Sequence, residues 1–364
     1  LADADIDAIA TLLKFEDTRQ FDAAAFSTIL ASPHPEVRRR AVMSLGRIVT
    51  EGARPMLATL RDDADAEIRA TAAWATGQQK DAAALPWLAA QLTKKGQDAV
   101  GHEAAQAFGK IVTPESWAAL SAYLSSAPLT APPAIAGEAL LSAGRFTVPA
   151  NQTPIVNDVA SIVRWTTVPN VEVRWRAAWA LARLRHPGGA AAILKASTDT
   201  SPVVRFWAMR GLALPAIKDS TVTADVASAR LRQAMNDPDR RVRTEAVRAL
   251  ATHGDAAAIA ALGSALESPD TWLSVSAADN TIARPDGAAL ALACDVTREE
   301  QVAAAVEATM ARFGRIDALV NAAGISAPRI TLDDSDETSI DAMWRVNVKG
   351  PLRMIRAALP HLRA

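Results

Sequence analysis

A single helical phrase recurs along most of the chain and constrains its fold more than any other feature of the sequence. One copy reads HPEVRRRAVMSLGRI at 34–48, and another reads NVEVRWRAAWALARL at 170–184. Successive copies lie 31 to 38 residues apart, which is typical of supersecondary units that stack on their neighbours. The copies lie at 34–48, 65–77, 100–111, 134–146, 170–184, 201–213, 239–251 and, in a weaker form, 270–279.

Each copy is predicted to form an amphipathic helix. In the first copy Val37, Ala41 and Leu45 recur at helical spacing and make one apolar stripe. A second apolar helix is predicted before each copy, so the unit is a pair of helices. A polar residue followed by proline predicts the N-cap and first residue of a helix. Such pairs are Ser32-Pro33, Ser201-Pro202, Asp237-Pro238 and Ser268-Pro269.

The phrase "apolar-Arg-x-x-Ala-x-x-Ala-Leu-Gly" in a helical pair resembles the HEAT repeat family. The resemblance implies a mainly α protein in which residues 1–280 form an α-solenoid with a continuous core. Such an array implies a scaffold that binds a protein partner. The repeats also resemble HEAT arrays that accompany peptidyl-prolyl isomerase domains in some bacterial proteins, so an array detached from such an isomerase is an alternative.

The arginine of the phrase recurs and has two interpretations. A row of guanidinium groups could bind an anionic partner. Alternatively, each arginine could bond an acid or carbonyl in the turn of the neighbouring repeat, and the regular recurrence favours this structural ladder. The arginines are Arg38, Arg69, Arg174, Arg205 and Arg243, and the nearest acids in sequence are Glu36, Glu67, Glu172 and Asp239.

An aromatic cluster is predicted on two adjacent repeats. Trp175 and Trp179 lie four residues apart, and Phe206 occupies the position of Trp175 in the next repeat. Exposed aromatic side chains of this kind are typical of protein-binding hot spots. Packing between repeats is the alternative, and we favour it for this cluster because solenoid helices touch neighbours on both sides.

Composition excludes several classes of function. The net charge of -1 predicts neither nucleic-acid nor anionic-membrane binding, and no apolar run is long enough to span a bilayer. One cysteine, Cys294, and five scattered histidines predict no metal site. The chain begins at Leu1, so we expect it to be part of something longer, and a cytoplasmic location is favoured.

The pattern changes between about 272 and 285. The run ALALAC at 289–294 and residues 316–320 are predicted as buried strands. Thr297, with Glu300 three residues later, predicts a capping box for a helix that ends at Gly314. A long helix is predicted from about 339 to 362. Alternating strands and helices indicate an α/β arrangement.

Three motifs in this region resemble the short-chain dehydrogenase/reductase family: CDVT at 294–297, IDALVNAAG at 316–324 and MWRVNVKG at 343–350. The resemblance implies a partial Rossmann-type fragment over 281–364 and an NAD or NADP cofactor. It places Asp295 near the adenine, and Asn321, Ala322 and Gly324 along the ribose. It makes Asn347 the residue that orders a water in the proton relay. Each residue also has a structural interpretation, as a turn cap, a strand-end contact or a kink contact.

Parts that the resemblance requires are missing from this chain. There is no glycine-rich phosphate turn of the TGxxxGxG type, and the only tyrosine, Tyr123, lies in a repeat. The fragment would keep the family's third and fourth strands without the two that separate them. We therefore expect that no cofactor binds well. We expect the chain to be a binding scaffold that carries a catalytically incomplete segment. The alternatives are a fragment of an NAD(P)-dependent oxidoreductase, or a chimera of two gene fragments joined near 275–287.

Overall fold

The structure is a computed structural model that describes residues 2–362 except 97, 148–152, 219, 267, 271, 275, 278–291, 293 and 327–336. It divides into two compact units, Leu1–Leu262 and Gly263–Ala364, which are described separately. The predicted domain boundary at 280 lies outside the described residues. In the described ranges the secondary structure is helical, and no strand is formed.

The helices of the first unit are α1 (Asp3–Thr18), α2 (Ala23–Leu30), α3 (Pro35–Arg47), α4 (Ala53–Thr59), η1 (Leu60–Asp62), α5 (Ala66–Gln78), η2 (Ala82–Ala84), α6 (Leu85–Gln91), α7 (Asp98–Phe108), α8 (Pro114–Ser126), α9 (Pro133–Ala143), α10 (Ala160–Val163), η3 (Arg164–Thr167), α11 (Val171–Leu184), η4 (Pro187–Gly189), α12 (Ala190–Ala196), α13 (Pro202–Gly211), α14 (Leu214–Ile217), α15 (Ala224–Ala234) and α16 (Arg240–Leu250). Helix α17 (Ala256–Leu266) crosses the division. The second unit continues with α19 (Glu299–Phe313), α20 (Glu337–Trp344), the π-helix η5 (Arg345–Lys349) and α21 (Gly350–Leu362).

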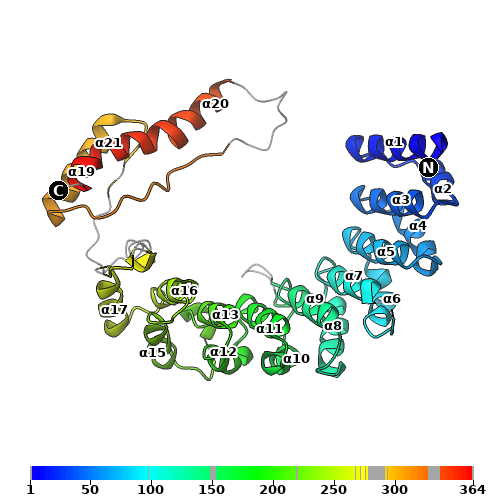
Figure 1. Cartoon of the computed structure of the whole chain (residues 1–364), viewed down its shortest axis with the longest axis horizontal. Coiled ribbons are helices and arrows are strands. Elements are labelled where there is room, and N and C mark those ends of the chain that lie inside the picture. Colours follow the sequence, from blue (N-terminus) through cyan, green and yellow to red (C-terminus); the bar gives the residue numbers. More distant parts are fainter. Residues whose placement is uncertain are drawn as a thin grey trace. The chain divides into compact units, whose positions relative to one another are not determined.

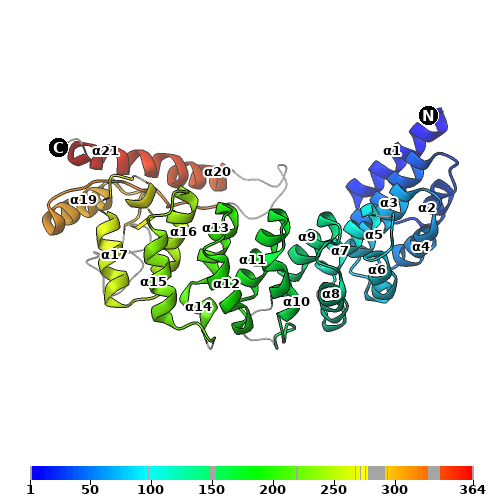
Figure 2. The ribbon, with the colours of Figure 1, turned by 60° about the horizontal axis from the view of Figure 1, so that its bottom comes forward.

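The first unit is a stack of helical pairs, as the repeats predict. Its helices lie in two rows along an arc (Figures 1 and 2). Helices α3, α5, α7, α9, α11, α13 and α16 carry the repeated phrase and form the inner row, in which each helix packs on the next. Their apolar stripe is the core, and Val37, Ala41 and Leu45 are almost completely buried.

The glycine that ends several phrases lets consecutive inner helices approach closely. A Cβ atom at Gly77 would lie 2.8 Å from Ala107 Cα. At Gly46 and Gly144 an added Cβ would overlap the indole of a tryptophan from the next inner helix. Absence of a side chain at this position therefore sets the spacing between repeats.

The predicted helix starts are only partly correct. Helix α13 begins at Pro202 after Ser201, as predicted. Helices α3 and α16, however, begin two residues after the predicted prolines. The N-cap of α16 is Asp239, whose carboxylate accepts a hydrogen bond from the Arg241 amide at 2.9 Å. The physical reason is that the recurring arginine of each phrase hydrogen-bonds to the carbonyls of this turn, so the predicted proline lies in the turn and not in the helix.

The second unit differs from the predicted α/β arrangement. Residues 315–326 are irregular and form no strand. A strand needs a neighbour to satisfy its amides and carbonyls, and the family's intervening strands are not in the sequence. The predicted strand at 289–294 lies mostly outside the described residues. Helix α19 ends at Gly314 with φ 76°, as predicted, but its N-cap is Arg298 and Thr297 makes no capping box.

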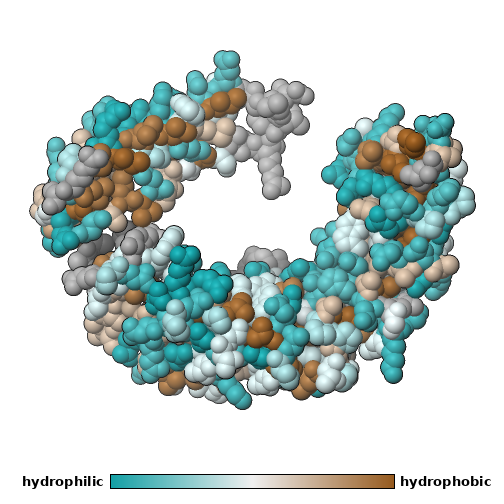
Figure 3. Space-filling view, in the orientation of Figure 1, coloured by the Kyte–Doolittle hydropathy of each residue, from teal (hydrophilic) through white to brown (hydrophobic). Residues whose placement is uncertain are grey.

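The second unit has a small core and a large exposed apolar surface. Val302, Val306 and Ala358 are its buried apolar side chains on α19 and α21. Hydrophobic patches follow α20 and α21 (Figure 3). They include Trp344, which is 54% exposed, and Leu352, which is 55% exposed. The described helices and irregular segment of this unit do not bury the apolar surface that a complete α/β domain buries.

Candidate functional sites

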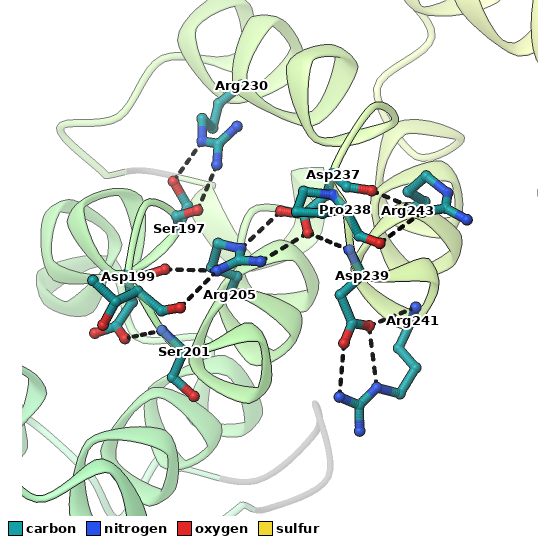
Figure 4. Close-up of polar contacts among 11 residues, drawn as sticks. Ser197, Asp199, Ser201, Arg205, Arg230, Asp237, Pro238, Asp239, Arg241 and Arg243 are labelled. Carbon is teal, nitrogen blue, oxygen red and sulfur yellow. Dashed lines mark hydrogen bonds and ion pairs between the residues drawn. The ribbon is translucent and has the colours of Figure 1, made fainter.

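The recurring arginines close the turn in front of their own helix. Arg205 Nη1 donates to the carbonyl oxygens of Asp199 at 2.9 Å and Thr200 at 3.1 Å (Figure 4). These carbonyls lie six and five residues before the arginine. The same pair of bonds, at the same spacing, is made by Arg38, Arg69, Arg174 and Arg243.

The other edge of the guanidinium binds the turn of the next repeat. Arg205 Nε and Nη2 donate to the two Asp237 carboxylate oxygens at 2.7 and 2.9 Å. Both side chains are nearly buried, with exposures of 13% and 7%. This is a bidentate, charge-assisted pair that joins two repeats. Equivalent pairs are Arg38–Asp63 and Arg174–Asp199.

These contacts confirm the structural ladder and correct its predicted partners. Two of the acids that are nearest in sequence instead pair with other arginines at the start of the same helix: Glu36 pairs with Arg39, and the N-cap Asp239 pairs with Arg241. The actual partners lie 25 or 32 residues further along the chain. Each of these arginines donates to two carbonyls, and Arg38, Arg174 and Arg205 also bind a carboxylate, so this row is not a free anion-binding surface.

The ladder also perturbs its carboxylates. Burial alone would raise the pKa of Asp237, but the hydrogen bonds from Arg205 and the Asp239 amide outweigh it and lower that pKa below its ordinary value. The hydrogen bond from Arg241 lowers the pKa of Asp239 to about 2. Both groups therefore remain charged at neutral pH, and the ladder is intact there.

The predicted aromatic residues lie on the inner row, and three rings are in contact. Trp179 on α11 meets Trp207 on α13 edge to face, with centroids 6.4 Å apart. Phe206 meets Trp207 at 4.9 Å. Trp175 lies apart from these contacts: its Nε1 donates to Glu172 at 2.9 Å, and it stacks with Arg176. We call Trp175, Trp179, Phe206 and Trp207 the aromatic surface; each side chain is half-buried.

A pocket of 560 Å³ opens beside this surface. Trp179 and Trp207 form part of its wall, together with Arg183, Arg185 and Arg210. The Arg183 guanidinium lies over the Trp179 ring at 5.4 Å, and that of Arg210 lies over the Trp207 ring at 5.7 Å. The volume falls within the range of ligand pockets in proteins. We call this cavity the inner-row pocket.

In the second unit, Asp295 caps a turn. Its Oδ1 accepts hydrogen bonds from the Thr297 amide at 2.9 Å and the Thr297 hydroxyl at 2.8 Å. The Thr297 amide and hydroxyl, together with nearby Arg298 and Arg345, lower the pKa of Asp295. In this structure Asp295 therefore makes the contacts of a turn cap.

Asn347 holds the NAAG segment in place. It lies in the π-helix η5, where Oδ1 accepts from the Ile325 amide and Nδ2 donates to the Ile325 carbonyl, both at 2.8 Å. This pair brings Asn347 against Gly324, where an added Cβ would lie 3.6 Å from Oδ1. Asn321 and Ala322 precede this contact in the same irregular segment and are exposed.

The three motifs of the second unit therefore meet around the start of α21. Gly350 lies directly against Val296, so that no Cβ would fit between them. The structure brings together Val296, Gly324 and Asn347 but does not align them on the edge of a sheet. That edge is where α/β proteins bind a dinucleotide.

Three residues of the aromatic region were not predicted from the sequence: Trp207, Arg183 and Arg210. Trp207 directly follows Phe206, and a comparison of adjacent positions across the repeats could have found it. Arg183 comes directly after the position that glycine occupies in other copies of the phrase. Arg47, Lys110 and Arg145 directly follow that glycine in their own copies, so they are equivalent to Arg183. This second basic row was a signal available in the sequence. Arg210 carries no periodic signal.

Two family models match the chain. One, described as HEAT repeats, matches residues 23–109, 54–140 and 162–229, which together cover just over half of the chain. The other, described as short chain dehydrogenase, matches residues 244–364. The second match begins within α16, inside the repeat array.

Individual relatives are similar to only part of the chain. L-fucose dehydrogenase of Bos taurus is 40% identical over 72 residues, which are 20% of this chain and 27% of that protein. An uncharacterized oxidoreductase of Staphylococcus saprophyticus is 43% identical over 68 residues, which are 19% of this chain and 29% of that protein. The chain thus spans well under half the length of these curated relatives.

Solved structures show the same fold at low identity. The Escherichia coli protein YibA has a TM-score of 0.52 and 14% identity, and the match covers 74% of this chain and 96% of that chain. A homology model of the full-length AP-3 complex has a TM-score of 0.57 and 12% identity over 98% of this chain and 64% of that chain.

The stacked helical pairs and the arginine ladder define a helical-repeat protein. The chain belongs to the HEAT-repeat family, and it carries a C-terminal segment with short-chain dehydrogenase homology. In the part of the chain that the structure describes, no helix is both long and apolar enough to cross a membrane. No group of His, Cys, Asp and Glu in the same residues could hold a metal ion.

Proposed function

We propose that this chain is a scaffold that binds a protein partner on the inner row of its HEAT array. The observation that carries the proposal is the aromatic surface: Trp207 contacts both Trp179 and Phe206, and all three rings are only half-buried. Trp179 and Trp207 also border an open pocket. Rigid aromatic side chains with partial exposure supply much of the binding free energy in protein interfaces.

Trp175 offers the cleanest test of this proposal. Its indole stacks on Arg176 and donates to the exposed Glu172, so Trp175→Ala removes contact area without opening the core. We expect Trp175→Ala to leave the helicity measured by circular dichroism intact and to abolish recovery of cross-linked partners by the full chain. Trp272→Ala is the matched control, because Trp272 is 60% exposed and lies outside the aromatic surface. Equal recovery by both variants would refute the proposal, and so would unfolding of Trp175→Ala.

We propose further that the dehydrogenase-like segment is catalytically incomplete in this chain. The family resemblance requires a tyrosine as proton donor, and Tyr123 is the only one. It lies in α8, and burial raises its pKa to about 12. Its hydroxyl is buried without a hydrogen-bond partner in the described structure. A phenol in this environment packs in the solenoid and does not serve the second unit.

The residues of the second unit also do not fit a nicotinamide dinucleotide. Asp295 Oδ1 is used by Thr297, and both polar atoms of the Asn347 amide are used by Ile325. A cofactor would have to displace these bonds. With no glycine-rich turn in the sequence, no backbone cradle is present for the pyrophosphate.

The alternative function is that of a partial NAD(P)-dependent short-chain oxidoreductase, and the family match over 244–364 favours it. Titration of the full chain with NADH and NADPH, followed by cofactor fluorescence, separates the two functions. We expect no saturation at millimolar cofactor. Saturable binding that Asn347→Ala weakens would overturn the incomplete-segment proposal and support the oxidoreductase.

A further inference from the structure

We propose that the inner-row pocket is a subsite for an acidic peptide segment of the protein partner. This inference rests on the proposed scaffold function and specifies the chemistry of the partner. The pocket lies at the C-terminal ends of α11 and α13, and its other side is formed by Phe146, Thr147, Pro154 and Val156. Its distinguishing feature is an excess of positive charge over an aromatic wall.

The positive charge is only partly neutralised within the described residues. Arg183 and Arg185 are exposed, and no carboxylate of the described chain forms an ion pair with either one. Arg210 is 58% exposed and lies 3.9 Å from Glu245, which Arg248 shares at 3.6 Å. One carboxylate thus faces two guanidinium groups on that side. The ladder arginines are different, because they meet aspartates in nearly buried pairs.

The arginines are also held in orientation without losing their charge. Arg183 Nε donates to the Gly144 carbonyl at 3.1 Å, and its guanidinium stacks on Trp179. Arg210 stacks on Trp207 in the same way. A cation–π contact holds a guanidinium over the ring and leaves its outer N–H groups available. A planar fork of this kind binds a carboxylate through two parallel hydrogen bonds.

A helix-terminus role does not account for this arrangement. A cation in the last turn of a helix is stabilised by the helix dipole. That effect accounts separately for Arg183 in the last turn of α11 and for Arg210 in the last turn of α13. It does not explain why both guanidinium groups lie over tryptophan rings around a common cavity of 560 Å³. A cavity of this size admits a few side chains, with carboxylates on the arginines and an apolar group on the indoles.

The geometry favours a peptide over a nucleic acid. A nucleic acid needs a track of cations that follows its phosphates. Here Arg183, Arg185 and Arg210, which have a single carboxylate partner between them in the described chain, line one pocket. Arg47 and Arg145, of the same basic row as Arg183, are paired with Glu16 and Glu138. A short acidic peptide is complementary to positive charge gathered in one pocket, whereas a nucleic acid is complementary to an extended row of positive charges.

The test measures fluorescence anisotropy of labelled peptides with the full chain. The probes are fluorescein-labelled EEFEE, QQFQQ and KKFKK. We expect EEFEE to bind at least tenfold more tightly than QQFQQ, with affinity that falls as salt rises, and we expect KKFKK not to bind. Arg183→Gln combined with Arg210→Gln should weaken EEFEE at least tenfold. Arg39→Gln is the matched control, because Arg39 is a partly exposed arginine on α3.

Equal affinity for EEFEE and QQFQQ would overturn the inference, as would an unchanged affinity in the double variant. A labelled dT12 oligonucleotide that binds as tightly as EEFEE and is lost in the double variant would also overturn it, in favour of a general polyanion site. Arg185→Gln provides a second variant if the double variant unfolds, and it should weaken EEFEE as well. If EEFEE does not bind but recovery of cross-linked partners is still lost in Trp175→Ala, the acidic-peptide inference is wrong and the scaffold function stands.

Discussion

Replacing Arg205 tests whether the ladder holds the repeats together. Arg205→Met keeps the aliphatic stem and removes four hydrogen bonds, two to carbonyls and two to Asp237. The Asp237 carboxylate would remain nearly buried, with one hydrogen bond left from the Asp239 amide. Removing one partner of a buried pair costs about 3–5 kcal/mol, because the other charge is left uncompensated.

The assay is urea unfolding of the full chain, followed by circular dichroism. Asp237→Asn and the double variant complete a thermodynamic cycle, and we expect a coupling free energy of at least about 2 kcal/mol. Arg39→Met is the control, since Arg39 binds Glu36 through the same groups at exposures of 37% and 57%. It should change the free energy of unfolding by less than about 0.5 kcal/mol.

The pH dependence provides a second measurement on the same pair. The folded-state pKa of Asp237 lies below its unfolded value of about 3.9, so its contribution is present above that pH and disappears as pH falls through the folded value. The difference in unfolding free energy between wild type and Asp237→Asn should therefore shrink below about pH 4. A cost for Arg205→Met that equals that of Arg39→Met, or a difference that is constant with pH, would refute the ladder as the source of stability.

Three further changes test other contacts. Gly144→Val should destabilise the array by about 1–3 kcal/mol, because the new side chain would overlap Trp179; thermal unfolding at wild-type stability would contradict this. Asn347→Ala should speed amide exchange at Ile325 about tenfold, because both of its hydrogen bonds to that residue are lost; unchanged exchange would show that Asn347 does not hold Ile325 in place. The Tyr123 pKa of about 12 predicts no tyrosinate absorbance near pH 10.5 until the chain unfolds, and titration near 10 would place its ring in solvent.

The sequence predicts the inner-row helices well because their apolar stripe is a local, periodic signal. Helix α11, for example, begins and ends within a residue of the predicted phrase. The partners of the arginines could not be read in the same way. Asp237 is 32 residues from Arg205, and which turn faces which arginine depends on how the repeats stack.

The functional surfaces were predicted less completely. The aromatic prediction found Trp179 and Phe206 but not Trp207, which joins them, because a ring contact between helices has no local spacing rule. In the second unit Asn347 lies close to Gly324, a contact that the family motifs did not predict. They do not predict a sheet here, because strand formation depends on neighbouring strands that this chain lacks.

The central claim is that binding resides in the HEAT array and not in the dehydrogenase-like segment. Hydrogen–deuterium exchange of the full chain, alone and with a captured partner, tests it directly. We expect the partner to slow exchange in α11 and α13, which carry the aromatic surface. Protection confined to residues 294–326 and 337–362, with α11 and α13 unchanged, would contradict the account.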